Sequence, residues 1–417
     1  MIDIQKLREN PALFREATKN KGFNPDVVDE VLRFDKERKE LVQKVEKLRG
    51  ERNELSKSQT ANSQERGREI KKHLQDIEPQ LKRVQDSMQE LLLRIPNPSE
   101  NDVKVGKNDT ENEIIKTWGE PRTFDFPVKD HLEIGESLDI IDVKRAAKIS
   151  GARFYFLKGD GARLEWALLQ FAVETLSKHN FIPVIPPVII NQSSMQGMGY
   201  IEHGGIDDMF VLERDGKVLV GTSEQSIGPM HMDEVFDVKE LPRRYMGYSA
   251  CFRREAGSYG KDTRGIIRVH QFNKVEMFSY TTSEQGDKEH EFLLSLEESL
   301  FQALKIPYHV AKMCTGDLGA PASRKYDIEA WMPSQQKYRE VTSTSTTTDF
   351  QSRRLNIKYK DGKKVEYVHM LNGTAFSMGR PIVAILENFQ EIDGSVILPE
   401  VLRKWMGKER IRGGDNI

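Results

Sequence analysis

Guanidinium groups are concentrated in one stretch of the 417-residue chain, from Tyr245 to Tyr280. Arg253 and Arg254 precede a glycine-rich segment, and Arg264 and Arg268 follow it. Arginine makes fixed, bidentate contacts with phosphate oxygens, so the stretch predicts a site for a polyanion. An exposed hairpin with paired surface charges explains the same composition equally well, because charge-rich segments are usually solvated.

Two amphipathic strands, roughly 245–254 and 267–280, are expected to position these side chains. In the second run, Val269, Phe272, Val275 and Phe278 interleave with His270, Lys274 and Glu276. A strand with this pattern has one face on a core and the other face in a site. The glycine-rich loop between the strands, residues 257–264, is expected to be mobile.

The segment FRREAG…DTRGIIRVHQF resembles motif 2 of the class II aminoacyl-tRNA synthetases, in the form carried by seryl-tRNA synthetases. This resemblance implies an α+β fold with an antiparallel sheet flanked by helices. It also implies an ATP site in which Arg253 binds the α-phosphate and Phe272 stacks on adenine. In the same site, Glu255 contacts the adenine ring, Val269 contacts the nucleotide through its backbone, and Arg254 lies close by.

A hydroxyl and a carboxylate follow an apolar strand in the segment VLVGTSEQSI. Thr222 or Ser223 would suit a helix N-cap there, with Glu224 in the first turn. The segment also resembles the T-x-E loop of the family, which binds the ammonium and side chain of the amino acid. Glu276 matches the residue that contacts the serine hydroxyl. By resemblance, the serine pocket contains Thr222, Ser223, Glu224, Arg253, Glu276, Asn372 and Thr374.

Residues 369–390 resemble motif 3 of the class, and residues 314–359 match the family almost continuously. Arg380 begins an apolar helix, whose N-terminus favours anions, and it is implied to bind the γ-phosphate. Glu340 and Ser343 are implied to hold Mg²⁺ between the ATP phosphates, since hard oxygen ligands suit that ion. Val341 and Thr342 are assigned to the same ATP site. The predicted chemistry depends most on Arg253, Glu276 and Arg380.

Residues 27–95 predict an antiparallel coiled-coil hairpin. Positions from Val31 to Leu55 and from Ile70 to Ile95 are spaced alternately by three and four residues, the period of a coiled coil. The polar stretch 56–67 is expected to be a solvated tip, and Pro79 is expected to kink or break the second helix. Such a hairpin commonly serves as a dimerisation element or a spacer, and an RNA-contacting arm is the alternative.

Basic residues are concentrated at the distal end of this hairpin. Residues 44–72 contain nine Lys and Arg against five Glu, although the whole chain has a formal charge of −2. Cations that contact phosphates supply much of the affinity for nucleic acid. By resemblance, the hairpin grips the long variable arm of tRNA(Ser). The predicted contacts are Lys57, Arg66, Arg68, Lys71 and Lys72.

Pro96 and Pro98 end the hairpin, which predicts a tRNA-binding domain at residues 1–100 and a catalytic domain at 101–417. Helices are expected at 132–141 and 165–179 of the second domain. The proline-containing run FIPVIPPVIIN, residues 181–191, predicts an edge strand, because proline cannot donate to a sheet ladder. It resembles motif 1 of the class and therefore implies a homodimer.

Composition excludes several other classes of protein. Two cysteines are too few for a disulfide scaffold or a Cys-rich zinc site, so a reducing compartment and no zinc are expected. The longest apolar runs fall short of the ~18 residues that a membrane span needs. The N-terminal sequence MIDIQKLREN has no signal-peptide core. A cytoplasmic protein without membrane contact is expected.

The resemblance implies activation of L-serine with ATP and Mg²⁺, followed by transfer to tRNA(Ser). Whether tRNA(Sec) is also charged stays open. One alternative is a class II ligase for a neighbouring amino acid such as threonine or proline. The other is a catalytically silent tRNA-binding paralogue, although Arg253, Glu276 and Arg380 are all of the types that the chemistry needs.

Overall fold

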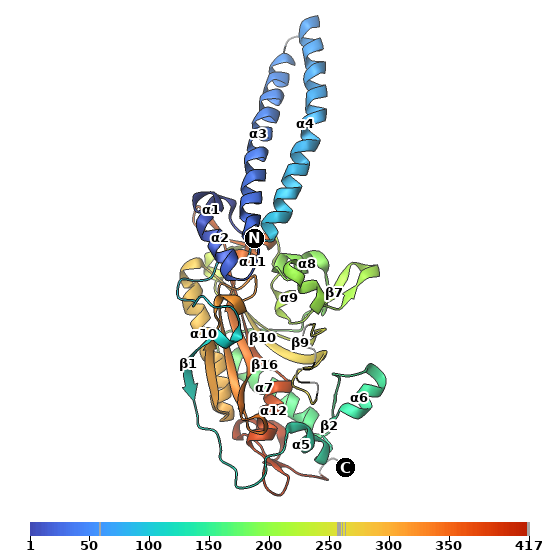
Figure 1. Cartoon of the computed structure of the whole chain (residues 1–417), viewed down its shortest axis with the longest axis vertical. Helices are drawn as coiled ribbons and strands as arrows, with labels where there is room; N and C mark the ends of the chain where they lie inside the picture. Colours follow the sequence, from blue (N-terminus) through green and yellow to red (C-terminus); the bar gives the residue numbers. More distant parts are fainter. Residues whose placement is uncertain (58–59, 257–259, 261, 263, 415–417) are drawn as a thin grey trace. The chain divides into compact units, whose positions relative to one another are not determined.

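A computed structural model describes residues 1–57, 60–256, 260, 262 and 264–414 of the chain (Figure 1). The chain divides into two compact units, Met1–Pro98 and Ser99–Ile417. Residues 257–259, 261 and 263 make up most of the segment for which the sequence predicts mobility, and they lie outside the described residues.

Four helices build the first unit: α1 (Ile4–Glu9), α2 (Pro11–Asn20), α3 (Asp26–Leu55) and α4 (Ala61–Leu93). The two long helices, α3 and α4, run side by side, as Figure 1 shows in blue. Val45, Ile70 and Leu74 are buried between them. The coiled-coil hairpin predicted from the heptad spacing is therefore confirmed.

Two details of the predicted hairpin are wrong. The tip is shorter than 56–67, because α4 already begins at Ala61 and Thr60 Oγ1 accepts the Ser63 N–H at 3.3 Å. Of the kink or break predicted at Pro79, the break is absent, since α4 is continuous from Ala61 to Leu93, and the kink stays a prediction. Pro79 and Gln75, whose carbonyl loses its helical partner, are both exposed. Water can therefore satisfy that carbonyl without interrupting the helix.

An eight-stranded sheet forms the second unit, in the order β1–β11–β12–β13–β16–β10–β9–β4. Its strands are β1 (Glu113–Trp118), β4 (Ile182–Val184), β9 (Arg243–Phe252), β10 (Gln271–Thr281), β11 (Tyr308–Lys312), β12 (Arg324–Met332), β13 (Lys337–Thr346) and β16 (His369–Ser377). All neighbouring pairs are antiparallel except β4 with β9. β4 ends the sheet and contains Pro183, so the first part of the edge strand predicted at residues 181–191 is confirmed, whereas the end of that run forms β5 (Ile189–Asn191) in another sheet.

Several helices contribute to the large core of this sheet, among them α7 (Asp160–Ser177), α10 (Gly286–Leu304) and α12 (Gly379–Asn388). Val275 and Met277 of β10 belong to that core. Because side chains alternate along a strand, Lys274, Glu276 and Phe278 point to the opposite face. Phe278 belongs to a separate cluster with Tyr280. The two faces of β10 therefore serve a core and a polar site, as its sequence predicts.

Some predicted boundaries differ from the structure. The expected helix 132–141 is α5 (His131–Ser137), which ends early because Asp139 takes a left-handed backbone conformation with φ 57°. The second strand of the arginine-rich stretch begins at Gln271 instead of 267. Arg268 and Val269 thus lie in irregular chain before β10.

Smaller elements complete the second unit. They include α8 (Gln192–Met198), α9 (Glu224–Ile227), α11 (Phe350–Leu355), and a three-stranded sheet of β5 (Ile189–Asn191), β6 (Val211–Leu212) and β7 (Lys217–Leu219). Among the described residues, no helix combines the length and the apolar character needed to cross a bilayer.

Candidate functional site

A buried ion pair occupies the polar face of β10. Lys274 Nζ lies 2.5 Å from Glu276 Oε2, and the Glu276 residue is only 1% exposed. Thr374 sits directly opposite Glu276 on β16 and donates its hydroxyl to the same oxygen at 3.1 Å. Lys274 also donates to Thr222 Oγ1 at 3.1 Å. The structure thus brings together Thr222, Glu276 and Thr374, which the sequence assigns to one pocket.

A second carboxylate, that of Glu224, faces this pair from the start of α9. It is 4% exposed and accepts a 2.8 Å hydrogen bond from the Tyr200 hydroxyl. Gln351 Nε2 donates to the same oxygen at 3.4 Å. Burial and the negative charge of Glu276 raise the pKa of Glu224 to about 7, against the opposing effect of Lys274. The carboxyl of Glu224 therefore titrates near neutral pH.

Ser223 occupies the N-cap position of α9, but its side chain does not cap the helix. Its hydroxyl donates instead to the Gly247 carbonyl at 3.3 Å. The cap interpretation of Ser223 is therefore wrong. Thr222 Oγ1 lies 3.4 Å from the Glu224 backbone nitrogen, so a long capping contact from Thr222 coexists with its bond to Lys274.

The arginines of the β9–β10 stretch lie beside this pocket. Arg253 Nε donates to the Gly221 carbonyl at 3.2 Å, and its guanidinium lies 5.5 Å from the centre of the Phe272 ring. Arg268 Nη1 binds Glu255 Oε2 at 2.5 Å. Arg254 packs its guanidinium over the ring of Phe210, 5.4 Å from its centre. These groups form a cationic and aromatic surface that suits a nucleotide.

Arg380 joins this surface from the first turn of α12. Its Nη1 lies 3.0 Å from Glu340 Oε2 and 2.9 Å from the Glu340 carbonyl oxygen. The Glu340 side chain is 44% exposed, and its partial desolvation opposes ionisation, but the charges of Arg380 and Lys325 outweigh this effect and hold the pKa of the carboxyl below its ordinary value. Asn372, on β16, is buried and lies two residues from Thr374.

The four residues from Glu340 to Ser343 differ in exposure. Val341 and Thr342 are 1% and 2% exposed, and the Thr342 hydroxyl donates to the Thr374 carbonyl. Any contact between these two residues and a nucleotide would therefore use their main chain. Glu340 and Ser343 are more exposed and present two hard oxygen donors on β13. Such a sparse set fits Mg²⁺, which keeps several waters and binds substrate phosphates.

A groove of about 390 Å³ lies between the helices of the hairpin in the first unit. Its lining residues are Lys44, Lys47, Leu48, Glu51, Arg66, His73, Asp76, Ile77 and Gln80. Of the predicted RNA contacts, Lys57 pairs with Glu54 at 2.7 Å and Arg66 pairs with Glu69 at 2.9 Å. Arg68, Lys71 and Lys72 are exposed. Exposed pairs of this kind are weak, so phosphates can compete for these cations.

Sequence reasoning missed three residues of the pocket. Lys274 was recognisable as a charge on the polar face of β10, but nothing in its spacing showed that it would pair with Glu276. Tyr200 and Gln351 reach Glu224 from segments 24 and 127 residues away along the chain. No local pattern reports such contacts, since they exist only once the fold has formed.

The chain matches two family models: "Seryl-tRNA synthetase N-terminal domain" over residues 1–98 and "tRNA synthetase class II core domain (G, H, P, S and T)" over residues 210–389. The serine–tRNA ligase of Acidothermus cellulolyticus is 44% identical over 419 residues, with 99% of each chain covered. That of Thermobifida fusca is 45% identical over 418 residues, with 98% of each covered.

Two solved structures resemble the whole chain. The crystal structure of a seryl-tRNA synthetase from Pyrococcus horikoshii complexed with ATP has a TM-score of 0.94 and 39% identity, with 100% of both chains covered. A cytoplasmic serine–tRNA ligase from Naegleria fowleri in complex with AMP has a TM-score of 0.91 and 33% identity. It covers 100% of this chain and 99% of its own.

The pairing of Lys274 with Glu276 predicts a clear effect on stability. Lys274→Met should lower the free energy of unfolding by about 3–5 kcal/mol, because it leaves a buried carboxylate without its cation. The double variant Lys274→Met/Glu276→Gln should recover most of this loss. Urea-induced unfolding measures both changes.

Lys116→Met is the matched control, because it removes an exposed lysine that pairs with Glu298 at 2.7 Å. Its cost should stay below about 1 kcal/mol. If Lys274→Met is as stable as the unmodified chain, Lys274 does not compensate Glu276.

Proposed function

Since the chain belongs to the seryl-tRNA synthetase family, we propose that it is a serine–tRNA ligase. It activates L-serine with ATP and transfers the seryl group to the 3′ end of tRNA(Ser). The observation that carries the choice of amino acid is the buried Glu276, held between Lys274 and Thr374. A carboxylate fixed in this way accepts a hydrogen bond from a small hydroxyl side chain.

Glu224 and Thr222 complete the recognition of serine. The Glu224 carboxylate, once ionised, attracts the substrate ammonium, and the Thr222 hydroxyl contacts both the Glu224 backbone N–H and Lys274. Asn372 and Thr374 line the same side of β16. Arg253 lies near the serine carboxylate and the α-phosphate, so that it brings the two reacting groups together.

In the first step, a serine carboxylate oxygen attacks the α-phosphorus of ATP. A new P–O bond forms, the bond to the β-phosphate bridging oxygen breaks, and pyrophosphate leaves with seryl-adenylate remaining bound. In the second step, a ribose hydroxyl of the tRNA 3′ end attacks the seryl carbonyl and AMP leaves. The enzyme needs no covalent nucleophile, so positioning and charge stabilisation supply the catalysis.

The nucleotide contacts are assigned from the family resemblance, and the cationic and aromatic surface described above supports them. Arg253 binds the α-phosphate, Arg380 binds the γ-phosphate, and Phe272 stacks on the adenine. Glu255 and Val269 contact the adenine and the nucleotide from the irregular chain around β10, with Arg254 and the main chain of Val341 and Thr342 nearby. Glu340 and Ser343 would hold Mg²⁺ with the bound ATP, and the ion would supply positive charge against the phosphates.

A second copy of the chain is the expected partner of the β4 edge. Ile182 and Ile185 are 42% and 86% exposed at this edge. A two-fold dimer through motif 1 would cover these side chains and protect the open strand. The cytoplasm suits the two buried free cysteines, Cys251 and Cys314, because thiols stay reduced there.

The test of the function is ATP–pyrophosphate exchange screened across the twenty amino acids. Serine should support exchange, and alanine should be about 10⁴-fold poorer, because it leaves Glu276 buried without its substrate donor. Glu276→Ala should narrow this discrimination. Equal activation of alanine and serine would show that the pocket is misassigned. Exchange with threonine or proline alone would favour a neighbouring ligase, and absence of any exchange would favour a silent paralogue.

The pKa of Glu224 predicts a pH dependence for serine binding. Because this pKa is raised to about 7, the free site is protonated below neutral pH and must release a proton to bind the ammonium. The KM for serine should therefore rise by up to about tenfold for each pH unit below 7, and level off above pH 8.

Glu224→Gln is the control for this profile. It should raise the KM at pH 8 and remove the dependence on pH, since the amide does not titrate. A flat profile between pH 6 and pH 8 in the unmodified enzyme would contradict the assignment of Glu224 to the ammonium.

The distal cations of the hairpin predict a salt-dependent contact with tRNA(Ser). Replacing Lys57, Arg66 and Arg68 with glutamine should weaken tRNA binding and leave serine-dependent exchange unchanged. The log–log slope of affinity against salt should flatten by about 0.7–0.9 per lost phosphate contact. Binding measured from low to moderate salt gives that slope.

Replacing Lys36, Lys82 and Arg83, which are exposed and lie nearer the base of the hairpin, is the matched control. It removes the same charge and should change the slope much less. Equal effects of the two triple variants would mean that only the overall charge of the hairpin matters. Normal tRNA binding by the distal variant would make the hairpin a spacer.

A further inference from the structure

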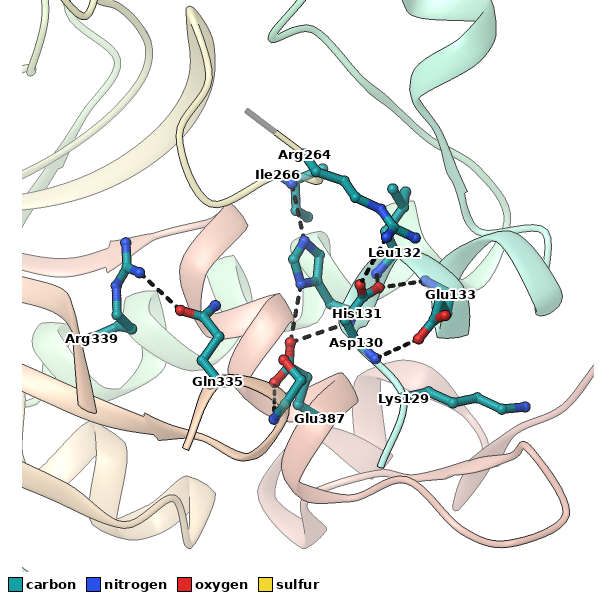
Figure 2. Close-up of polar contacts among 12 residues, drawn as sticks. Lys129, Asp130, His131, Leu132, Glu133, Arg264, Ile266, Gln335, Arg339 and Glu387 are labelled. Atoms are coloured by element: carbon teal, nitrogen blue, oxygen red, sulfur yellow. Dashed lines mark hydrogen bonds and ion pairs between the residues drawn. The ribbon is translucent and has the colours of Figure 1, made fainter. Parts of the chain in front are cut away.

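A buried hydrogen-bonded pair, His131 and Glu387, lies in the catalytic unit and makes none of the substrate contacts proposed above (Figure 2). His131 is the first residue of α5, and Glu387 lies in the last turn of α12. Their side chains are 6% and 0% exposed, and His131 Nδ1 lies 3.1 Å from Glu387 Oε1. Burying a carboxylate and an imidazole is costly, so a pair buried this completely must be stabilised by its own contacts.

Glu387 is held by donors from two other segments, as Figure 2 shows. Its Oε1 accepts the His131 backbone N–H at 3.2 Å and the His131 ring, and its Oε2 accepts the Ser334 backbone N–H at 3.0 Å. The negative end of the α12 dipole disfavours a carboxylate in the last turn. The position of Glu387 is therefore explained by what it binds, and not by the helix that carries it.

The second ring nitrogen of His131 binds the chain segment that precedes β10. Its Nε2 accepts the Ile266 backbone N–H at 3.2 Å. Because Nε2 is the acceptor, the ring proton lies on Nδ1 and is donated to Glu387. Gly265 has φ +81°, and a Cβ built there would lie 2.0 Å from His131 Nε2. The His131 ring therefore fixes the backbone path at Ile266 and leaves room only for glycine at position 265.

The opposite end of α12 binds the adjacent peptide group. Arg380 Nε donates to the Ile267 carbonyl at 3.4 Å. A Cβ built on Gly379 would lie 2.9 Å from the Ile266 carbonyl oxygen, so this end of the helix also touches the segment directly. Arg380 and Glu387 are seven residues apart, which is about two helical turns, or about 10.5 Å. Both ends of α12 therefore hold this segment. The first turn contacts it directly through Gly379 and Arg380, and the last turn reaches it through Glu387 and His131.

We propose that His131 and Glu387 are positioning residues for the nucleotide half of the site. By fixing Ile266 and Ile267 against α12, they set where Arg268 and Val269 leave the loop and where Arg380 lies relative to them. They do not touch the substrates. The inference rests on the proposed function for the assignment of Arg380 and Val269 to ATP.

Two substitutions of His131 separate its two hydrogen bonds. In His131→Gln, the amide oxygen reaches the Nε2 position and can still accept the Ile266 N–H. In His131→Asn, the amide nitrogen takes the Nδ1 position, so the bond to Glu387 is kept and the Ile266 N–H is left buried without an acceptor. His131→Asn should raise the KM for ATP by about 5- to 100-fold, the range of one unmatched buried donor.

His131→Gln should stay within about threefold of the unmodified KM for ATP, and the KM for serine should change by less than about twofold in both variants. Hydrogen exchange of the Ile266 amide gives a second readout, and it should accelerate in His131→Asn only. A general loss of stability would change the KM for ATP and the KM for serine together.

His231 provides the matched control, because both of its ring nitrogens are also hydrogen-bonded, to Glu234 at 2.7 Å and to the Tyr245 hydroxyl at 2.8 Å. Its Asn and Gln variants should give equal KM values for ATP. If His131→Asn does not fold, Glu387→Gln takes its place. The amide of Glu387→Gln leaves one backbone donor unmatched and should raise the KM for ATP in the same direction.

Equal KM values for ATP in His131→Asn and His131→Gln, or parallel changes for ATP and serine, would overturn the proposal. So would a normal KM for ATP in a folded Glu387→Gln enzyme. Absence of serine-dependent exchange in the unmodified enzyme would instead refute the proposed function. The two failures are therefore distinguishable.

Discussion

The burial of the Glu276 carboxylate in the middle of the sheet is the constraint on which the pocket depends. A buried carboxylate is costly unless a cation and hydrogen-bond donors compensate it. Lys274 supplies the cation from the same face of β10, and Thr374 supplies a hydroxyl from the neighbouring strand. Lys274 in turn donates to Thr222, so the loop before α9 is drawn into the same network. Compensating one charge therefore brings together segments that lie far apart in the sequence.

Glu224 gives this network an uneven charge. Burial and the negative charge of Glu276 together raise the pKa of Glu224 to about 7, because Lys274 already pairs with Glu276 and only partly offsets a second carboxylate. In the proposed function, a substrate ammonium would offset the second carboxylate and Arg253 would accommodate the carboxylate end. The free site thus lacks a cation for its second carboxylate. A zwitterionic amino acid can supply that cation, and a neutral ligand of the same size cannot.

The sequence predicts those features that local patterns encode. Heptad spacing revealed the hairpin of α3 and α4, alternation identified the two faces of β10, and the prolines marked β4 as an edge strand. The break predicted at Pro79 is absent, because solvent exposure let the helix continue. The predicted end of α5 is wrong, because Asp139 takes a left-handed conformation and ends the helix early. The roles of Glu276 and Arg380 came from resemblance. Lys274, Tyr200, Gln351 and the His131–Glu387 pair depend on contacts across the fold, which spacing does not report.

Steric constraints explain why these charges can come so close to the sheet. Gly247 lies on β9 directly opposite Glu276, and a Cβ there would lie 2.5 Å from Ile227 Cδ1 and 2.8 Å from Ser223 Oγ. A side chain at this position would push α9 outward, and Glu224 with it. The distance between the two carboxylates, which adds to the effect of burial on the pKa of Glu224, therefore depends on a residue that carries no charge. The packing around Gly247 and the electrostatics of the pocket are therefore coupled, because a small shift of α9 would change both.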